Sequence, residues 1–373
     1  MAKAVYVGVG SKARKMKKAY IGIGGKARKV KKMYIGVGGK ARLCYSAELE
    51  RYGMAAALST TRYDMRAATV GKYALFAGGL ARKSSFGYSV SSSVDAYNTS
   101  LTKSTPTELS CKRCGHAAAS VGGYALFAGG ALSHNFLGYG KPVSSVDAYD
   151  ASLTRSAAHI IGATVAIGGA AVGNYALFAG GKVYSQINED NVTSDVLAYD
   201  PSLTFTTAPL LSVARANVKG ASAVNYALFA GGRAGSFCTT VDAYNASLTR
   251  TTATALSSTK NNSAAATVGN HAIFVGNTAS ADIYDASLTK TSAAILSTAR
   301  TGLAATTVGD YAIFSGGGVA DFCDASLTRS SIGTSMTGYD MGAATIGDYA
   351  LFAGGHSGEK SDTAYDSVEV YTA

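Results

Sequence analysis

A seven-residue string, YALFAGG or a close variant of it, recurs seven times along the chain. The copies begin at Tyr73, Tyr124, Tyr175, Tyr226, His271, Tyr311 and Tyr349, so their spacings are 51, 51, 51, 45, 40 and 38 residues. Self-similarity at such a period is typical of a fold built from repeated units. This repeat constrains the architecture more than any other feature of the chain.

Each repeat has the pattern of four short strands. An Ala-rich strand precedes the YALFAGG strand, and a two-residue joint such as Gly71-Lys72 separates the two, as in a tight β-hairpin. A VDAYD-type third strand follows, then a DASLT-type turn and a Thr-rich fourth strand. Because one antiparallel unit of this size cannot bury both of its faces, we predict an all-β, seven-bladed β-propeller.

The two ends of the repeat array complement each other. The last repeat stops after its third strand, at 367–371, whereas residues 47–60 align with fourth strands such as 246–259. We therefore expect the N-terminal segment to complete the seventh blade and close the ring, which leaves no free sheet edge. The propeller is assigned to residues 46–373.

The Gly-Gly pair that ends the second strand, the VDAYD-type third strand and the Arg of LSTAR-type segments resemble the kelch-repeat family. The resemblance covers about 330 of the 373 residues and implies a kelch-like β-propeller. The chain departs from the family pattern in one respect, because kelch repeats usually carry a Trp on the fourth strand and this sequence has none.

Residues 1–45 repeat with a different period, of fourteen residues, and hold thirteen Lys or Arg but no Asp or Glu. Subtracting these thirteen from the total of 34 leaves 21 basic against 23 acidic residues elsewhere, so the whole net charge of +11 arises here. Each unit predicts a small hairpin with a basic return strand, and such hairpins are not stable alone in water. We therefore interpret the segment as a basic β-hairpin arm that needs a neighbour, which is another subunit, a larger assembly or a polyanion. Its candidate anchoring residues are Tyr6, Lys12, Arg14, Tyr20, Lys26, Arg28, Tyr34, Lys40 and Arg42.

The Tyr-, Gly- and Lys-rich repeats resemble those at the N-termini of structural proteins of bacteriophages and prophages, where such a segment joins a variable C-terminal module. The resemblance implies a virion component, such as a fibre, a tail protein or a head decoration, at the particle surface. The arm would contact other particle subunits, as part of a homo-oligomer or larger assembly, and the propeller would bind a host-surface glycan or protein. A different function, binding of nucleic acid or an anionic cell-wall polymer through the arm, also fits the charge.

The sequence has no run of eighteen apolar residues, and its Lys- and Gly-rich start lacks the apolar middle of a signal peptide. We expect no membrane span and synthesis in the cytoplasm. The five cysteines are odd in number and scattered, which is typical of free thiols in a reducing compartment. They are Cys44, Cys111, Cys114, Cys238 and Cys323.

Motifs for catalysis or for metal and cofactor binding are not found. GxSxG, P-loop and HExxH patterns are missing, and no two of the five histidines stand at metal-ligand spacing. Cys111 and Cys114 form one CxxC motif. We interpret them as two cysteines of the linker segment between blades, with zinc binding or redox chemistry as the alternative. The predicted axial strands carry Ala, Thr, Ser and Val, where sugar-cleaving propellers place carboxylates. We therefore expect a binding scaffold without enzyme activity, cofactor or metal.

One basic residue recurs in the LSTAR-type segment between blades. These residues are Arg62, Arg113, Arg215, Lys260 and Arg300. Five cations in a ring would attract an anionic ligand. Alternatively, each cation pairs with an acid of the third strand and holds the blades together. Those acids are Asp95, Asp147, Asp242, Asp282 and Asp321.

The loops differ between the two faces of the predicted propeller. Turns that join strands one to two and three to four share one face and are short, whereas the second-to-third loops at 80–93, 131–145 and 182–195 are long. These three loops carry aromatic and amide side chains of the kind that stack on sugars or fill protein pockets, so we predict a ligand-binding face there, with simple packing on the rim as the alternative. The residues concerned are Phe86, Tyr88, His134, Asn135, Phe136, Tyr139, Tyr184, Gln186, Asn188, Glu189 and Asp190. The acidic residues of the third loop are taken as a solvated loop, with calcium binding as the alternative.

Overall fold

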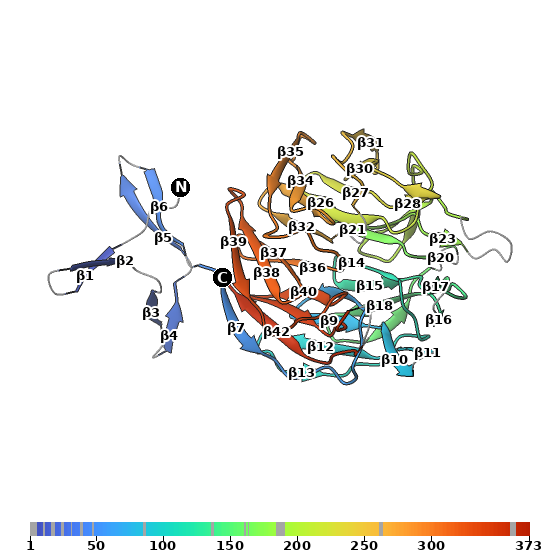
Figure 1. Ribbon diagram of the computed structural model, residues 1–373, viewed down its shortest axis with the longest axis horizontal. Coiled ribbons are helices and arrows are strands. Elements are labelled where there is room, and N and C mark those ends of the chain that lie inside the picture. Colours follow the sequence, from blue (N-terminus) through green and yellow to red (C-terminus); the bar gives the residue numbers. More distant parts are fainter. Residues whose placement is uncertain are drawn as a thin grey trace.

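The computed structural model shows seven four-stranded antiparallel sheets arranged around a central axis, with three two-stranded hairpins to one side (Figure 1). It describes residues 6–9, 12–15, 19–23, 26–30, 32–37, 40–46, 48–84, 87–135, 138–159, 162, 164–183, 191–260, 264–358 and 363–373. Within these ranges all regular elements are strands, and no helix suited to crossing a membrane occurs. The predicted all-β, seven-bladed propeller is confirmed.

Each blade takes its four strands in chain order from the axis outward, and the seventh takes its last strand from the N-terminal side. Blade 1 contains β8 (Arg66–Val70), β9 (Tyr73–Ala77), β12 (Val94–Asn98) and β13 (Lys103–Ser104). Blade 2 contains β14 (Ala117–Val121), β15 (Tyr124–Ala128), β18 (Val146–Asp150) and β19 (Arg155–Ala157). Blade 3 contains β21 (Gly168–Val172), β22 (Tyr175–Ala179), β24 (Val196–Tyr199) and β25 (Phe205–Ala208). Blade 4 contains β26 (Lys219–Ala223), β27 (Tyr226–Ala230), β30 (Val241–Asn245) and β31 (Arg250–Ala253).

The remaining three blades follow the same order. Blade 5 contains β32 (Ala264–Val268), β33 (His271–Val275), β34 (Ser280–Tyr284) and β35 (Lys290–Ala294). Blade 6 contains β36 (Ala304–Val308), β37 (Tyr311–Gly316), β38 (Val319–Asp324) and β39 (Arg329–Gly333). Blade 7 contains β40 (Gly342–Ile346), β41 (Tyr349–Ala353), β42 (Val368–Thr372) and β7 (Glu50–Met54).

The seventh blade is closed by the N-terminal side of the propeller, as the sequence predicts. Strand β7 pairs antiparallel with β42, with Glu50 opposite Thr372 and Met54 opposite Glu369. The side chain of Arg51 forms an ion pair with Glu369, which is fully buried. This pairing covers the outer edge of β42, which would otherwise expose unpaired backbone groups.

The core consists of layers between adjacent blades. In six blades a Phe of the second strand and a Tyr of the third strand meet edge to face, as Phe76 and Tyr97 do at 5.9 Å between ring centroids. Both rings are fully buried, and the Tyr97 hydroxyl donates a hydrogen bond to the carbonyl of Ala56 at 2.7 Å. Tyrosines at equivalent positions donate to the same region of the preceding chain, as Tyr149 does to Thr107. The YALFAGG and VDAYD repeats therefore supply one repeated packing unit.

The residues of the short turns between the third and fourth strands account for the conformation of these turns. In the DASLT-type turns an Asp or Asn accepts two backbone hydrogen bonds, as Asp150 does from Ser152 and Thr154 at 2.9 Å each. Leu153 in this turn has a φ of +66°, a conformation that few residues other than Gly adopt. The Asp side chain stabilises the turn in which this leucine is placed.

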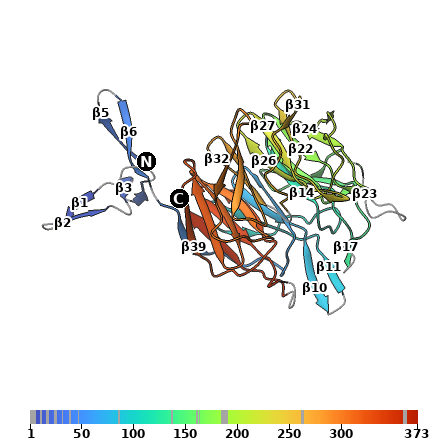
Figure 2. The same ribbon diagram turned by 45° about the horizontal axis from the view of Figure 1, so that its top comes forward.

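The arm forms three hairpins beside the propeller, on the side of β7 and β39 (Figures 1 and 2). They pair β1 (Tyr6–Val9) with β2 (Lys12–Lys15), β3 (Tyr20–Ile23) with β4 (Lys26–Lys29), and β5 (Lys32–Val37) with β6 (Lys40–Ser46). Strands β2, β4 and β6 are the basic return strands expected from the fourteen-residue period.

The role of β7 can be tested by truncation. A chain of residues 46–373 keeps β7, whereas a chain of residues 55–373 lacks it and leaves the buried Glu369 without Arg51. We expect the longer chain to unfold like the full protein and the shorter one to lose about 3 kcal/mol or more in free energy of unfolding. Urea denaturation measures the difference, and size-exclusion chromatography detects association through the exposed β42 edge. Equal stability of the two chains would contradict the proposed closure.

Candidate functional site

The second-to-third connections form small extra hairpins on one face of the propeller. Blade 1 has β10 (Leu80–Ser84) with β11 (Gly87–Val90), and blade 2 has β16 (His134–Asn135) with β17 (Gly138–Tyr139). Blade 4 has β28 (Arg233–Ala234) with β29 (Ser236–Phe237), whereas in blade 3 β23 (Lys182–Val183) pairs with β20 (Thr164–Val165) of the segment that precedes this blade. Among the described residues, the connections between strands on the opposite face are short turns. We call the first face the hairpin face.

A polar cavity of about 210 Å³ lies where the hairpin face meets the axis. We call it the axial pocket. It is lined by Tyr63, Asp64, Arg66, Leu80, His134, Asn217, Lys219, Leu303, Asp340 and Met341. These residues come from the segments that lead into the first strands of blades 1, 4, 6 and 7, and from the hairpins of blades 1 and 2. The pocket therefore collects side chains that are far apart in the sequence.

Backbone conformation explains why polar residues occur in the axial pocket. Asp64, Asn217 and Asp340 have φ values of +51°, +57° and +52°, and Asp and Asn tolerate this left-handed region better than most residues. Their backbone N–H groups bridge neighbouring blades, as in the bond from Asp64 to the carbonyl of Asp340 at 2.9 Å. A conformational requirement of the blade junction thus places two carboxylates and an amide beside the axis.

The two carboxylates of the axial pocket have defined partners. Asp64 forms an ion pair with Arg66 at 2.9 Å and accepts a hydrogen bond from the backbone N–H of Gly115 at 3.0 Å. Asp340 lies 3.2 Å from Nε2 of His356. Burial acts to raise the pKa of Asp340, but the bond with His356 and the nearby cations outweigh it, so the pKa lies below its ordinary value. Asp340 is therefore ionised at neutral pH.

Lys219 is the fourth charged residue of the axial pocket. It is the first residue of β26 and is half-buried. Among the residues that the structure describes, none forms a hydrogen bond or an ion pair with its ammonium group. Burial lowers the pKa of Lys219, and the charge of Arg66 lowers it further, whereas Asp340 and Asp64 act in the opposite direction. The pocket thus offers acceptors, an engaged guanidinium and an unpaired ammonium.

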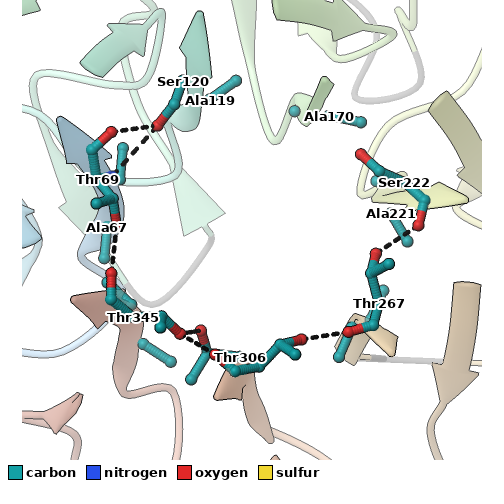
Figure 3. Close-up of a pocket in the computed structure, with 18 residues that line it drawn as sticks. Ala67, Thr69, Ala119, Ser120, Ala170, Ala221, Ser222, Thr267, Thr306 and Thr345 are labelled. Carbon is teal, nitrogen blue, oxygen red and sulfur yellow. Dashed lines mark hydrogen bonds between the residues drawn. The ribbon is translucent and has the colours of Figure 1, made fainter. Parts of the chain in front are cut away.

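The other end of the axial channel is lined by hydroxyl groups (Figure 3). Each hydroxyl donates to the carbonyl of the equivalent residue in the preceding blade, as Ser120 does to Thr69 and Ser222 to Ala171, at 2.7 and 2.6 Å. The donors are Thr69, Ser120, Ser222, Thr267, Thr307 and Thr345. Blade 3 has Ala171 at this position and cannot donate. The resulting ring of hydrogen bonds is open between blades 2 and 3.

The five recurrent cations form ion pairs below the surface. Arg62 pairs with Asp95 at 2.7 Å, and in this pair both side chains are fully buried. The same contact joins Arg113 to Asp147, Arg215 to Asp242, Lys260 to Asp282, and Arg300 to Asp321. Burial alone would raise the pKa of Asp282, but bonds from Ser257 and the charge of Lys260 bring it below its ordinary value. The structure therefore shows the pairing alternative and not an open ring for an anionic ligand.

The repeats also show how this ion pair is replaced. In blade 3, Thr164 and Leu197 stand at the positions of the cation and the acid, so both charges are missing together. In blade 7, Gly338 replaces the linker cation, and Glu369 keeps the fourth-strand cation, Arg51. The acids of the other five blades pair with a cation at the same fourth-strand position, which is Lys103, Arg155, Arg250, Lys290 or Arg329. Every buried acid therefore keeps at least one cation, which agrees with the high cost of an unpaired buried charge.

Most of the predicted ligand-binding residues lie outside the described part of the chain. Phe86, Phe136 and residues 184–190, which include Tyr184, Gln186, Asn188, Glu189 and Asp190, are not described, and Asn135 and Tyr139 are placed by their backbone in β16 and β17. Tyr88 and His134 are described. Their rings meet edge to face at 5.0 Å, which joins the hairpins of blades 1 and 2, and His134 also lines the axial pocket.

The remaining candidates are placed as follows. Cys111, Cys114, Cys238 and Cys323 are free, as expected, and burial raises the pKa of Cys323 to about 12. Burial likewise raises the pKa of Cys114, so this thiol is not activated for redox chemistry. Among the described residues no cluster of three metal-ligating side chains is found.

In the arm, Tyr20 and Tyr34 are each 59% exposed. The other anchoring candidates, Tyr6, Lys12, Arg14, Lys26, Arg28, Lys40 and Arg42, are placed by their backbone in the hairpins. Strands β1, β3 and β5 therefore carry the tyrosines, and their partner strands carry the cations.

The axial pocket was not predicted from the sequence. The first strands carry no carboxylate, and the segments that lead into them, which hold Asp64 and Asp340, gave no motif. The available signal was the pair of positions two and four residues after the LSTAR-type cation, which hold Asp64 and Arg66 in blade 1 and Asn217 and Lys219 in blade 4. Most other blades have Gly or Ala there.

The chain matches no protein-family model and no curated protein.

The open ring of hydroxyls provides one test of the axis. Ala171→Ser adds the missing donor toward the carbonyl of Ser120, so we expect the free energy of unfolding to rise by about 0.5–1.5 kcal/mol. Ser222→Ala removes an existing donor and should lower it by a similar amount. Thermal or urea denaturation measures both changes, and a destabilising Ala171→Ser would contradict the proposed geometry.

The natural replacement in blade 3 provides a test of the buried ion pairs. Arg113→Thr removes the fully buried partner of Asp147 and leaves only the partly exposed Arg155, so we expect a loss of about 3 kcal/mol in free energy of unfolding, the lower end for a broken buried pair. Adding Asp147→Leu, which recreates the blade 3 pair in blade 2, should recover a large part of this loss. A double-mutant cycle by urea denaturation measures the coupling, and additive losses would show that the two charges act independently.

Proposed function

We propose that this protein is a non-enzymatic, kelch-like propeller of a phage-like particle, which binds a host-surface glycan through its hairpin face and attaches to the particle through residues 1–45. The observation that carries the binding role is the axial pocket. Its carboxylates, amide and cations form one concave polar site on the face that also bears the extra hairpins. Ligand sites are typically concave and contain a few convergent polar groups.

The difference between the two faces supports this assignment. The short-turn face repeats nearly the same turn in every blade, as a structural requirement of the fold. The hairpin face varies from blade to blade, and its hairpins in blades 1 and 2 contact each other through Tyr88 and His134. Variable loops on a rigid scaffold are the usual location of binding sites.

The size and polarity of the pocket favour a glycan over a protein partner. Its volume of about 210 Å³ is smaller than the ~300–1,000 Å³ of sites for drug-sized ligands, and it suits a single sugar ring. Carboxylates such as Asp64 and Asp340 accept hydrogen bonds from sugar hydroxyls. Tyr63 lines the same cavity, with its ring packed against that of His356 at 4.7 Å.

The state of the two carboxylates supports binding without hydrolysis. Glycoside hydrolysis requires a carboxylic acid whose pKa is raised so that it can protonate the leaving group. The pKa of Asp340 is lowered instead, and Asp64 is held by Arg66 and by the N–H of Gly115. Asp340 therefore does not have the environment of a general acid.

The composition and exposure of the arm support an anchoring role. Tyr20, Ile21, Tyr34 and Ile35 are each more than half exposed, which is unusual for large apolar side chains on small hairpins. Such two-stranded units are marginal on their own. Contact with other particle subunits would cover these side chains and stabilise the hairpins.

Binding by the propeller can be tested with a glycan array. We expect the full chain and residues 46–373 to bind the same glycans, and the double variant Tyr88→Ala, His134→Ala to lose at least about tenfold in affinity, because it separates the two hairpins. The control Lys72→Ala lies in a short turn of the opposite face and should bind normally. Binding that depends on the arm, or that survives the double variant unchanged, would contradict the proposal.

The charge of the arm favours a second candidate function, binding of a polyanion. Thirteen cations without an acid in residues 1–45 would release counterions from nucleic acid or an anionic cell-wall polymer. The affinity of the full chain for DNA would then fall steeply with added salt, whereas residues 46–373 alone would not bind. Titrations at several salt concentrations distinguish this function from attachment to particle subunits.

A further inference from the structure

We propose that the axial pocket selects an acidic sugar, whose carboxylate pairs with the ammonium of Lys219 while its hydroxyls donate to Asp64 and Asp340. This inference rests on the proposed glycan-binding function and specifies the class of ligand. It starts from the one cation of the pocket that has no partner among the described residues.

Lys219 differs from the other cations buried in the propeller. Arg62, Arg113, Arg215, Lys260 and Arg300 each have an aspartate partner within the blade that follows. Lys219 is half-buried, yet the described residues give its ammonium neither a hydrogen bond nor an ion pair. Asp340 and Asp64 favour its charge through space without a direct contact, and burial outweighs them, so the charged ammonium remains at a cost. An anionic group in the pocket would remove this cost.

The fold does not require a lysine at this position. The equivalent residues at the starts of the other first strands are Arg66, Ala117, Gly168, Ala264, Ala304 and Gly342. Five of these six are Ala or Gly, so small residues satisfy the packing around the axis. The long side chain of Lys219 therefore has a role other than filling space.

The two long side chains at this level differ in their partners. Arg66 already binds Asp64 at 2.9 Å, and Asp340 binds His356 at 3.2 Å. The positive charge that is available to an incoming anion is therefore that of Lys219. The two carboxylates repel the anionic group, so it lies on the Lys219 side of the pocket. The same carboxylates retain acceptor capacity for hydroxyl groups. A ligand that combines one anionic group with several hydroxyls satisfies both parts of the pocket.

Matched sugars test this preference on the full chain. The probes are the methyl glycosides of glucuronic acid, galacturonic acid and N-acetylneuraminic acid, with methyl glucoside and methyl galactoside as neutral counterparts. We expect at least one acidic glycoside to bind about tenfold or more tightly than the neutral ones, because a charge-assisted contact is stronger than a neutral one. Isothermal titration calorimetry measures the affinities.

Variants of Lys219 locate the effect. Lys219→Met should remove the preference for the acidic glycoside, and Lys219→Arg should retain most of it. Lys72→Met, which removes a cation from the short-turn face, serves as the matched control and should change nothing. Thermal denaturation of each variant verifies that the propeller is folded.

The outcomes separate this inference from the proposed function. Equal binding of acidic and neutral glycosides, or an unchanged preference in a folded Lys219→Met protein, overturns the acidic-sugar assignment. In that case, glycan-array binding that is lost in the Tyr88→Ala, His134→Ala variant still supports a glycan-binding face. If the array and all five glycosides show no binding, both proposals are wrong.

Discussion

The close approach of the seven innermost strands around the axis determines much of the rest of the structure. A Cβ atom added to Gly169 would lie 2.5 Å from the carbonyl oxygen of Ala118 in the preceding blade, and one added to Gly220 would clash with the carbonyl oxygen of Gly169. Only small residues fit at such positions, which accounts for the Ala-rich first strands. The same proximity lets neighbouring blades bond to each other at both ends of the channel.

Two kinds of inter-blade hydrogen bond follow from this proximity. At the short-turn end, Ser and Thr hydroxyls donate to carbonyls of the preceding blade, with one interruption at Ala171. At the hairpin end, backbone N–H groups of residues with positive φ make the corresponding bonds, as Asp340 does to Gly302 at 2.8 Å. The first kind requires a particular side chain and the second does not. Side chains at the hairpin end are therefore free to vary, and this is where the axial pocket lies.

The fold was predictable from the sequence because its determinants are repeated. Seven copies of one string gave the number of blades, and the incomplete last repeat indicated that residues near Glu50 pair with β42. The buried ion pairs remained one of two alternatives, since five recurrent cations are equally compatible with a ligand and with internal partners. The burial of these cations decides between the two alternatives. It depends on the path that the linker between blades takes over the following blade.

The axial pocket was not predictable in the same way, because it consists of differences between repeats. Asp64, Arg66, Lys219 and Asp340 stand at positions where the other repeats have Gly, Ala or Asn, and no single position resembles a motif. Their convergence requires that blades 1, 4 and 7 meet at one axis. The aromatic loops gave a stronger sequence signal, but only Tyr88 and His134 of that set have described side chains.

A symmetric propeller has no reason to distinguish one blade from another, so departures from the repeat indicate where selection has acted on something other than packing. Some departures preserve the fold by acting in pairs, since Thr164 with Leu197 removes both members of an ion pair. Lys219 forms no ion pair among the described residues, although Asp340 and Asp64 act on its charge through space. A long cationic side chain that the packing does not require, at the hairpin end of the axis, is better explained by a ligand than by the fold.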